Sequence, residues 1–502
     1  MKKNYQPDFA KIHSELNGIR DATDLMGHRI LKKWEKRGKM DAALRESMGN
    51  LAAYLALRHQ DLRSLQDELS HLGLSSLGRC ESRVMASLDG TLAALAVLDG
   101  AKRSRVSWPR PEEFTSGFEK ILKSANKILG PSNASKVRIM VTLPTTAAED
   151  EGWCRQLIKA GTSCVRINCA HDTPEIWLAM IRNVRRAARA VDREVRIQMD
   201  LTGPRARTMG CKLTDGETRI RNGDKIFLAR EEMSHPAPCK FETVCTLPEV
   251  VDALKKGTYV YFNEGKLGAV VTKKGKHGAH LLVTHAREKG ERFRDDMAIN
   301  VLDTDLDLEA LTGRDREHLD FVVQHADVVG YSFVQRADDM VTLHDELRQR
   351  SGLRKIKRPL AVVAKIETAL AVRNLPDIIV AGTTRGPMAV MIARGDLAVE
   401  LGAVRMAEIQ EELLWICEAA HVPVIWATQV LENLAKKGLP SRAELTDAAM
   451  SERAECVMLN KGPYILETVH VLNEVLTRMA GHQRKKMPTF RPLHSWEHLV
   501  QI

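Results

Sequence analysis

Eight short apolar runs, each followed by a stretch of helical character, dominate the sequence from about residue 135 onward. Each run is apolar throughout, as expected of parallel strands that are buried on both faces. The runs are Val137–Leu143, Cys164–Ala170, Val195–Leu201, Val328–Val334, Pro359–Ile366, Ala389–Gly395, Val422–Thr428 and Cys456–Asn460. Eight strand–helix repeats with short links predict an α/β fold, a TIM (β/α)8 barrel, in preference to an open sheet.

One connection in this pattern is far longer than the others. Residues 205–297 follow the third run and are rich in Thr, Gly and Lys, with strand-like segments closed by turns. We expect them to form a small inserted β-barrel domain, a lid at the barrel mouth. Without it the barrel comprises residues 129–204 and 298–485, or 264 residues. A lone (β/α)8 barrel needs about 250 residues, which agrees with this division.

The two ends of the chain differ from the barrel. Residues 1–128 are predicted to be an all-helical N-terminal extension, because leucines recur at helical spacing, as at Leu62, Leu65, Leu69 and Leu72. Residues 486–502 are assigned as a tail. The apolar stripes of the extension are typical of core or subunit contacts, so we expect a homo-oligomer, with a dimer favoured.

Composition excludes several classes of protein. No apolar run is long enough to cross a bilayer, and the N-terminus lacks the apolar core of a secretory signal. Nine cysteines without a CxxC pair predict reduced thiols in a cytoplasmic protein. The formal charge is +10, and the basic run at 29–39 raises the alternative of a nucleic-acid arm. Because Glu35 interrupts this run, we favour a solvated helix face and expect neither nucleic acid nor membrane as a partner.

Charged and polar side chains gather where the predicted strands end. In a barrel of this type the carboxyl ends of the strands carry the active site. Two carboxylates there can hold Mg²⁺, while arginines bind phosphate in a fork geometry and main-chain amides opening a helix bind another anionic oxygen. The side chains at these ends are Arg166, Asp200, Arg205, Arg207, Lys365, Glu367, Asp396 and Thr428, with the amides of 394–396. The set predicts a phosphorylated substrate bound with a divalent ion.

Neither GxGxxG after a strand nor GxxxxGK[ST] occurs, which argues against Rossmann and P-loop nucleotide sites. Instead, the strand-end segments resemble those of the pyruvate kinase family from about residue 135 to 480. The matching segments are VRINCAH, MDLTGPRART, VVAKIET, MIARGDLAVELG, VIWATQVLENLAKKGLPSRAELTDAA and CVMLNKG, in family order. The resemblance implies transfer of a phosphoryl group between phosphoenolpyruvate and ADP, giving pyruvate and ATP.

The resemblance also implies individual roles. Lys365 would stabilise the transferring phosphoryl group with Arg166 and Arg207, and Thr428 would lie near the carbon that is protonated. Glu367 and Asp396 would bind Mg²⁺ or Mn²⁺. The remaining assignments are substrate binding at Ala393, Arg394, Gly395 and Thr428, and nucleotide binding at Thr142, Pro144, Asn168 and His171.

The expected monovalent-cation region comprises Asn168, Asp200, Leu201 and Arg205. Members of the family that depend on potassium carry glutamate where this chain has Arg205, and Ala170 replaces a serine. The resemblance therefore implies that K⁺ is not required.

Other departures from the family leave alternatives open. Thr202 replaces a lysine, the glycine before Pro144 is absent, the loop at 460–464 is shorter, and the family's C-terminal regulatory domain has no counterpart here. One alternative is a metal-dependent lyase or aldolase acting on pyruvate-type oxo acids. Another is a non-catalytic regulatory homologue that uses the helical extension, which would cover the surface left free or mediate dimerisation.

Overall fold

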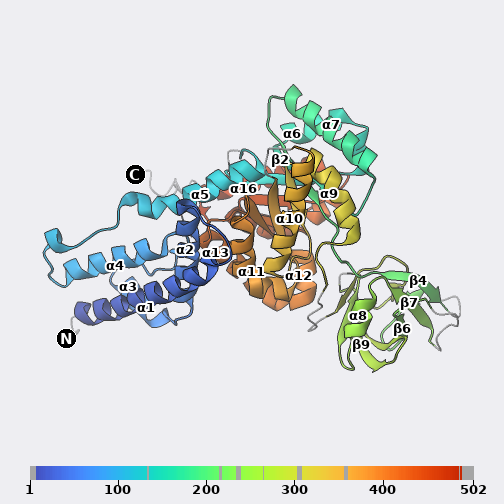
Figure 1. Ribbon diagram of the computed structural model, residues 1–502, viewed down its shortest axis with the longest axis horizontal. Helices are drawn as coiled ribbons and strands as arrows, with labels where there is room; N and C mark the ends of the chain where they lie inside the picture. The colour runs from blue at the N-terminus through green and yellow to red at the C-terminus, as the bar shows by residue number, and fades with distance from the viewer. Residues whose placement is uncertain are drawn as a thin grey trace, which may run out of the picture.

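The computed structural model describes residues 7–132, 135–213, 218–232, 239–263, 265–301, 308–355, 360–485 and 487–488. Figure 1 shows three regions: the N-terminal helices in blue, the barrel in the middle and the inserted domain in green at the far end. Pro359 and nearly all of the assigned tail lie outside the described residues.

Eight parallel strands close into a barrel, which confirms the predicted fold class. Around the barrel the strand order is β1-β17-β16-β15-β14-β13-β3-β2. The strands are β1 (Arg138–Thr142), β2 (Thr162–Asn168), β3 (Arg196–Asp200), β13 (Val328–Tyr331), β14 (Ala361–Ile366), β15 (Met388–Ala393), β16 (Val424–Ala427) and β17 (Cys456–Leu459). Each overlaps one predicted apolar run, and nearly every residue in them is buried. Because all strands run the same way, their carboxyl ends share one mouth.

Helices surround the barrel, and their starts follow local sequence signals. Thr312 and Asp315 form a capping box before α9, and Ser441 and Glu444 form one before α15, so each pair satisfies free amides of the first turn. The helices are α6 (Glu151–Lys159), α7 (Pro174–Ala190), α9 (Gly313–His325), α10 (Ala337–Leu353), α11 (Ala369–Thr383), α12 (Arg394–Leu401), α13 (Ala403–Ala419), α14 (Glu432–Lys437), α15 (Arg442–Met450) and α16 (Ile465–Met479), with single 3₁₀ turns η3 (Thr145–Ala148) and η4 (Ser451–Arg453).

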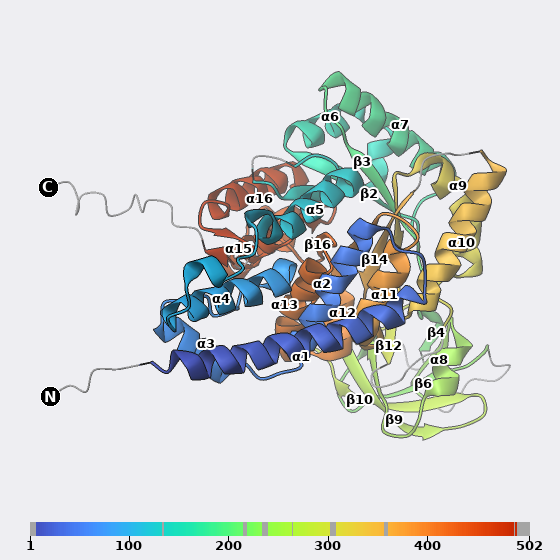
Figure 2. The same ribbon diagram turned by 60° about the vertical axis from the view of Figure 1, so that its left-hand side comes forward.

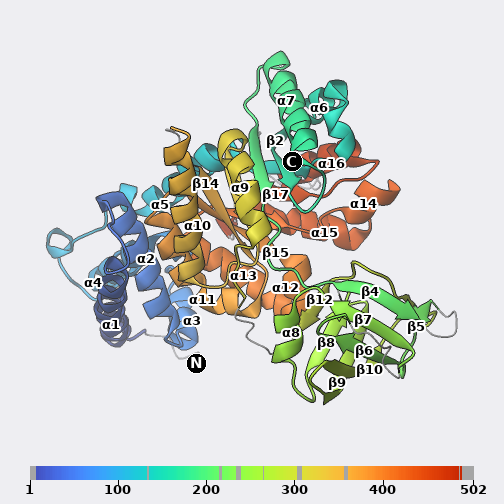
Figure 3. The same cartoon turned by 45° about the vertical axis from the view of Figure 1, so that its right-hand side comes forward.

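The inserted domain contains a seven-stranded sheet in the order β12-β8-β9-β10-β6-β7-β4 (Figure 3). Its strands are β4 (Thr208–Leu213), β6 (Lys225–Ala229), β7 (Phe241–Cys245), β8 (Tyr259–Phe262), β9 (Leu267–Lys274), β10 (Gly278–His285) and β12 (Ile299–Val301), with a short pair β5 (Arg219–Ile220) and β11 (Glu291–Arg292), and one helix α8 (Pro248–Ala253). A bridge between Arg207 and Ala298 brings the two ends of the sheet together.

The end of the inserted domain differs from the sequence prediction. β12 pairs antiparallel with β8, so the inserted sheet continues to Val301, past the predicted limit at residue 297. That pairing joins Ile299 to Phe262, far apart in the sequence. Because its partner strand is so distant in the sequence, the short strand β12 has no local sequence pattern that would assign it to the inserted sheet.

The N-terminal region consists of α1 (Phe9–Glu35), α2 (Ala42–Arg58), α3 (Arg63–His71), α4 (Val84–Leu98) and α5 (Pro111–Leu129), with single 3₁₀ turns η1 (Glu81–Arg83) and η2 (Arg103–Arg105). Figure 2 shows α1 and α2 lying against barrel helices α11 and α13. Trp34 Nε1 donates to Asp377 Oδ1 on α11 at 2.9 Å, and Asn50 Nδ2 donates to Ala419 O at 2.8 Å. At the end of α5, Ile128 and Leu129 pack with Met140 and other side chains inside the barrel.

After α16 the described chain ends in a hairpin of β18 (Gln483–Arg484) and β19 (Met487–Pro488). Among the described residues, no helix is both long and apolar enough to span a membrane. All nine cysteines are described and none forms a disulfide.

Candidate active site

A cavity of about 520 Å³ lies at the carboxyl ends of the barrel strands, and we call it the barrel-mouth cavity. Most of the residues predicted for the site line it. These are Thr142, Arg166, Asn168, His171, Leu201, Arg205, Arg207, Lys365, Glu367, Ala393, Gly395, Asp396 and Thr428. Asp200 is completely buried beneath this surface. Pro144 and Arg394 do not line the cavity.

Lys365, the second-to-last residue of β14, contacts three other residues of the site. Its Nζ donates to Ser332 Oγ at 2.6 Å and lies 2.9 Å from Glu367 Oε1 and 3.6 Å from Asp200 Oδ2. Only 8% of Lys365 is exposed, so these contacts form largely out of water, where they fix the ammonium group in one position.

Asp200 is the last residue of β3, and its carboxylate contacts two cations, Arg166 and Lys365. Arg166 Nε donates to Asp200 Oδ2 at 2.6 Å, and Gln198 Nε2 donates to Oδ1 at 2.7 Å. Burial opposes the charge of Asp200, but Arg166 and Lys365 outweigh burial and lower its pKa. The neighbouring strand makes room for this carboxylate, because a Cβ at Gly330 would lie only 1.9 Å from Asp200 Oδ1.

Glu367 and Asp396, the expected metal ligands, influence each other electrostatically. Burial raises the pKa of Glu367; the Lys365 ammonium opposes this rise, while the charge of Asp396 adds to it. Phe333 N donates to Glu367 Oε2 at 2.6 Å, and Arg205 Nη2 donates to Asp396 Oδ1 at 2.7 Å. Two carboxylates beside a polar cavity, one of them buried, are a donor set that fits a divalent cation.

Among the described residues no group of three or more His, Cys, Asp or Glu side chains is arranged to hold a metal. A Mg²⁺ site of two carboxylates completed by substrate oxygens and water does not need one.

Thr428 follows β16 in a left-handed backbone conformation, with φ of 65°. Such a conformation costs about 1–3 kcal/mol in a non-glycine residue and is typical of functional sites. Thr428 Oγ1 accepts from Gly395 N at 2.7 Å, so the hydroxyl proton remains free to face the cavity. In contrast, the Arg394 side chain turns away from the cavity to Asp447 and the ring of Trp426. Only the main chain of Arg394 therefore remains available for substrate.

The nucleotide residues expected from the sequence are only partly brought together. Thr142 Oγ1 accepts from Arg166 Nη1 at 3.1 Å, and Asn168 Oδ1 accepts from Ala170 N at 3.1 Å. Burial lowers the pKa of His171, and the nearby charge of Lys461 lowers it further. Arg207 forms an ion pair with Asp296 of the inserted domain at 2.7 Å.

Sequence reasoning missed several residues of the cavity. Ser332 and Phe333 follow β13 and line the cavity. Ser332 lies within the predicted run Val328–Val334, and a polar residue near the end of an apolar run was a usable signal. Lys461 and Lys436 also line the cavity. The segment that follows Lys461 packs against α14. Tyr464 N donates to Ala435 O at 3.1 Å, and a Cβ at Gly462 would lie only 2.2 Å from Ala435 O.

The family model of the pyruvate kinase barrel domain matches residues 134–469. The chain belongs to the pyruvate kinase family. Its barrel is similar to the pyruvate kinase of Thermococcus litoralis, with 31% identity over 350 residues, 68% of this chain and 69% of that protein. Similarity to pyruvate kinase 1 of Trypanosoma brucei brucei is 30% over 345 residues, 67% of this chain and 66% of that protein.

The enzyme of Geobacillus stearothermophilus is 29% identical over 350 residues, 68% of this chain and 57% of that protein. The chain thus aligns with between 57% and 69% of the length of these relatives. The similarity covers the barrel and the inserted domain, and the N-terminal helices lie outside the matched family model.

Proposed function

We propose that this protein transfers the phosphoryl group of phosphoenolpyruvate to ADP, giving pyruvate and ATP. The observation that carries the proposal is the contact of Lys365 with Glu367 and Asp200, beside Arg166, at the floor of one cavity. Membership of the family leads us to expect this reaction, and these four side chains supply the charges that phosphoryl transfer needs.

In the proposed reaction the bond between the enol oxygen and phosphorus breaks, and a terminal phosphate oxygen of ADP bonds to phosphorus. Arg166 and Lys365 neutralise the charge on the transferring group, and both are already fixed by Asp200. The enolpyruvate that leaves takes a proton at its methylene carbon. We propose Thr428 as the residue beside that carbon, because its hydroxyl oxygen accepts from Gly395 N and its proton can face the cavity.

Glu367 and Asp396 are the proposed ligands of Mg²⁺ or Mn²⁺. When bound, the ion would supply positive charge that offsets the negative charge of the substrates. Glu367 is held by Lys365 and the amide of Phe333, and Asp396 by Arg205, so both carboxylates are oriented before any ligand arrives.

For the nucleotide we propose the side of the cavity formed by Thr142, Asn168 and His171, with Pro144 just outside the lining. Lys461 adds a cation there, since its charge is felt by His171. Among the described residues that line the cavity, the other five lysines and arginines each contact a carboxylate, whereas Lys461 has none. Lys461 is therefore the cation that is free to receive a phosphate of ADP.

We also propose that the reaction does not require K⁺, although the structure supports this for a different reason from the one that the sequence suggested. The sequence suggested that Arg205 would stand in for K⁺, but Arg205 pairs with Asp396 and forms no ion pair with Asp200. Arg166 and Lys365 both contact Asp200 instead. Two protein cations at the expected monovalent-cation region support a reaction without K⁺.

The cellular setting is also proposed. Nine free thiols support a cytoplasmic location. A homodimer is favoured because Val404 and Leu439 are 91% and 77% exposed near the barrel mouth, where self-association would cover them.

The test is a coupled assay in which lactate dehydrogenase reports pyruvate formed from phosphoenolpyruvate and Mg²⁺, with and without ADP. Pyruvate formation that depends on ADP supports the kinase. If oxaloacetate or a related oxo acid yields pyruvate without ADP while phosphoenolpyruvate does not, the lyase alternative replaces it. If neither occurs and calorimetry shows no ADP binding, the non-catalytic alternative holds.

A further inference from the structure

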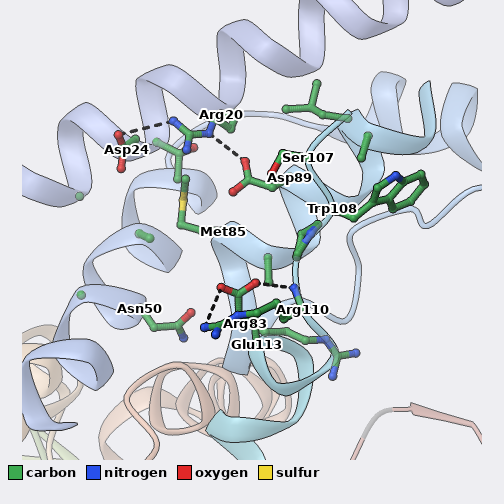
Figure 4. Close-up of a pocket in the computed structure, with 18 of the residues that line it drawn as sticks. Arg20, Asp24, Asn50, Arg83, Met85, Asp89, Ser107, Trp108, Arg110 and Glu113 are labelled. Carbon is green, nitrogen blue, oxygen red and sulfur yellow. Dashed lines mark hydrogen bonds and ion pairs between the residues drawn. The ribbon is translucent and has the colours of Figure 1, made fainter. Parts of the chain in front are cut away.

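A second cavity, of about 1050 Å³, lies between the N-terminal helices and the barrel, and we call it the junction cavity. It is lined by α1, α2, α4, the segment 101–110 and the start of α5, and Figure 4 shows many of these residues. From the barrel, His421 also lines it. No residue of this cavity belongs to the barrel-mouth cavity.

The junction cavity exists because small residues face it. Gly49 and Ala53 line it from α2, and Ala86, Ala93 and Ala96 line it from α4. Protein interiors are normally close-packed, so a space of this size between helices is a departure from ordinary packing. Met85 and Leu92 give the wall along α4 further apolar surface. A large, partly apolar cavity with a few polar groups is typical of a binding site for an organic molecule.

On the α1 side of the cavity one guanidinium group, that of Arg20, contacts two carboxylates of the lining. Arg20 Nε donates to Asp89 Oδ1 at 2.9 Å and lies 3.5 Å from Asp24, as Figure 4 shows. The hydrogen bond to Asp89 raises the pKa of Arg20, so this group is a fixed ion pair. The cation of this wall is therefore already paired and is not available to an anionic ligand.

The opposite end of the cavity carries excess positive charge. Arg83 Nη1 donates to the uncharged main-chain oxygen of Phe114 at 3.1 Å. Arg105 has no carboxylate partner among the described residues. Arg110 contacts Glu113 at 3.8 Å, and its side chain is 77% exposed. Glu46 also lines the cavity but is paired with Lys120 at 2.7 Å, so Glu113 is the carboxylate left to these three guanidinium groups. Arginines in this setting bind carboxylate, sulfonate or phosphate groups.

We propose that the junction cavity binds an amphipathic organic anion. Its acidic group is bound by arginines of the lining, Arg83 and Arg105 among them, and its apolar body lies along the alanine-rich face of α4. This inference does not depend on the reaction proposed for the barrel.

The test uses the full chain and anilinonaphthalene sulfonate, an aromatic sulfonate whose fluorescence rises in apolar surroundings. We expect one saturable site per chain. Arg105→Ala should weaken binding about tenfold, the loss of one charge-assisted contact. Arg103→Ala is the matched control, because Arg103 lies in the same segment but does not line the cavity.

A second variant tests the apolar part of the site. Ala96→Phe places a ring in the cavity from a partly exposed position, and it should abolish saturable binding while the thermal unfolding midpoint stays near that of the unmodified protein. The proposal is overturned if the probe shows no saturable site. It is equally overturned if Arg105→Ala and Ala96→Phe, both folded, bind the probe as the unmodified chain does.

Discussion

The two cavities of this protein are built in opposite ways. At the barrel mouth, large charged side chains project from strand ends and lock one another in ion pairs, as Lys365 does with Glu367 and Arg166 with Asp200. In the junction cavity, glycine and alanine leave space, and the arginines at one end are poorly compensated. The comparison teaches that fixed, paired charges suit catalysis, whereas an open apolar space with excess charge suits binding alone.

The largest effect should come from breaking the ion pairs of the barrel mouth. Lys365→Met removes the ammonium group that contacts Glu367, Asp200 and Ser332, and we expect kcat to fall about 10²- to 10³-fold. The control is Lys437→Met, an exposed lysine on α14 that does not line the cavity. Comparable activity of Lys365→Met and the control in the pyruvate assay would remove Lys365 from the reaction.

A smaller effect should come from Lys461, the cation without a carboxylate partner among the described residues that line that cavity. Lys461→Ala should raise KM for ADP about tenfold through loss of one charged contact, with KM for phosphoenolpyruvate nearly unchanged. Steady-state kinetics with each substrate varied in turn measures both. A rise in KM for phosphoenolpyruvate alone would place Lys461 at the other substrate.

Potassium should have less effect still. Since Arg166 and Lys365 already contact Asp200, adding K⁺ to a K⁺-free assay should change kcat by less than about twofold. A tenfold rise would show that these two side chains do not replace the ion.

The smallest effect concerns the junction between the two regions. Burial lowers the pKa of His421 to about 4 and its Nδ1 contacts Ser47 Oγ, so the folded protein holds this ring neutral. A histidine free in the unfolded chain has a pKa near 6.5 and binds more protons, so its contribution to stability is complete above about pH 6.5 and is lost as pH falls toward 4.

Thermal unfolding at pH 7.5 and pH 5 tests this. The midpoint should fall more for the unmodified protein than for His421→Asn. The pKa of His344 is also lowered to about 4, but this group is present in both proteins and cancels in the comparison. Equal falls in the two proteins would show that His421 carries no such pH dependence.

Much of the barrel mouth could be predicted from sequence because the fold itself assigns position. Once eight apolar runs are recognised as parallel strands, residues just after them, such as Glu367 and Asp396, must meet at one end. The direction of the Arg394 side chain could not be predicted, because it depends on Trp426 and Asp447 of later elements. The pairing of Arg205 with Asp396 could not be predicted either, because it joins residues from two distant segments of the chain.

The junction cavity left no comparable signal. Alanine at 93 and 96 and glycine at 49 are ordinary helix residues in the sequence, and only the crossing of α1, α2 and α4 shows that they leave a space. Long-range contacts also decided the end of the inserted domain, where β12 pairs with β8.

The central claim is that Glu367 and Asp396 act at one point above the barrel. Titration with Mn²⁺, followed by electron paramagnetic resonance, measures this without relying on turnover. The account predicts one site in the unmodified protein and a loss of affinity of similar size in Glu367→Gln and Asp396→Asn. Undiminished Mn²⁺ binding in either variant would contradict it.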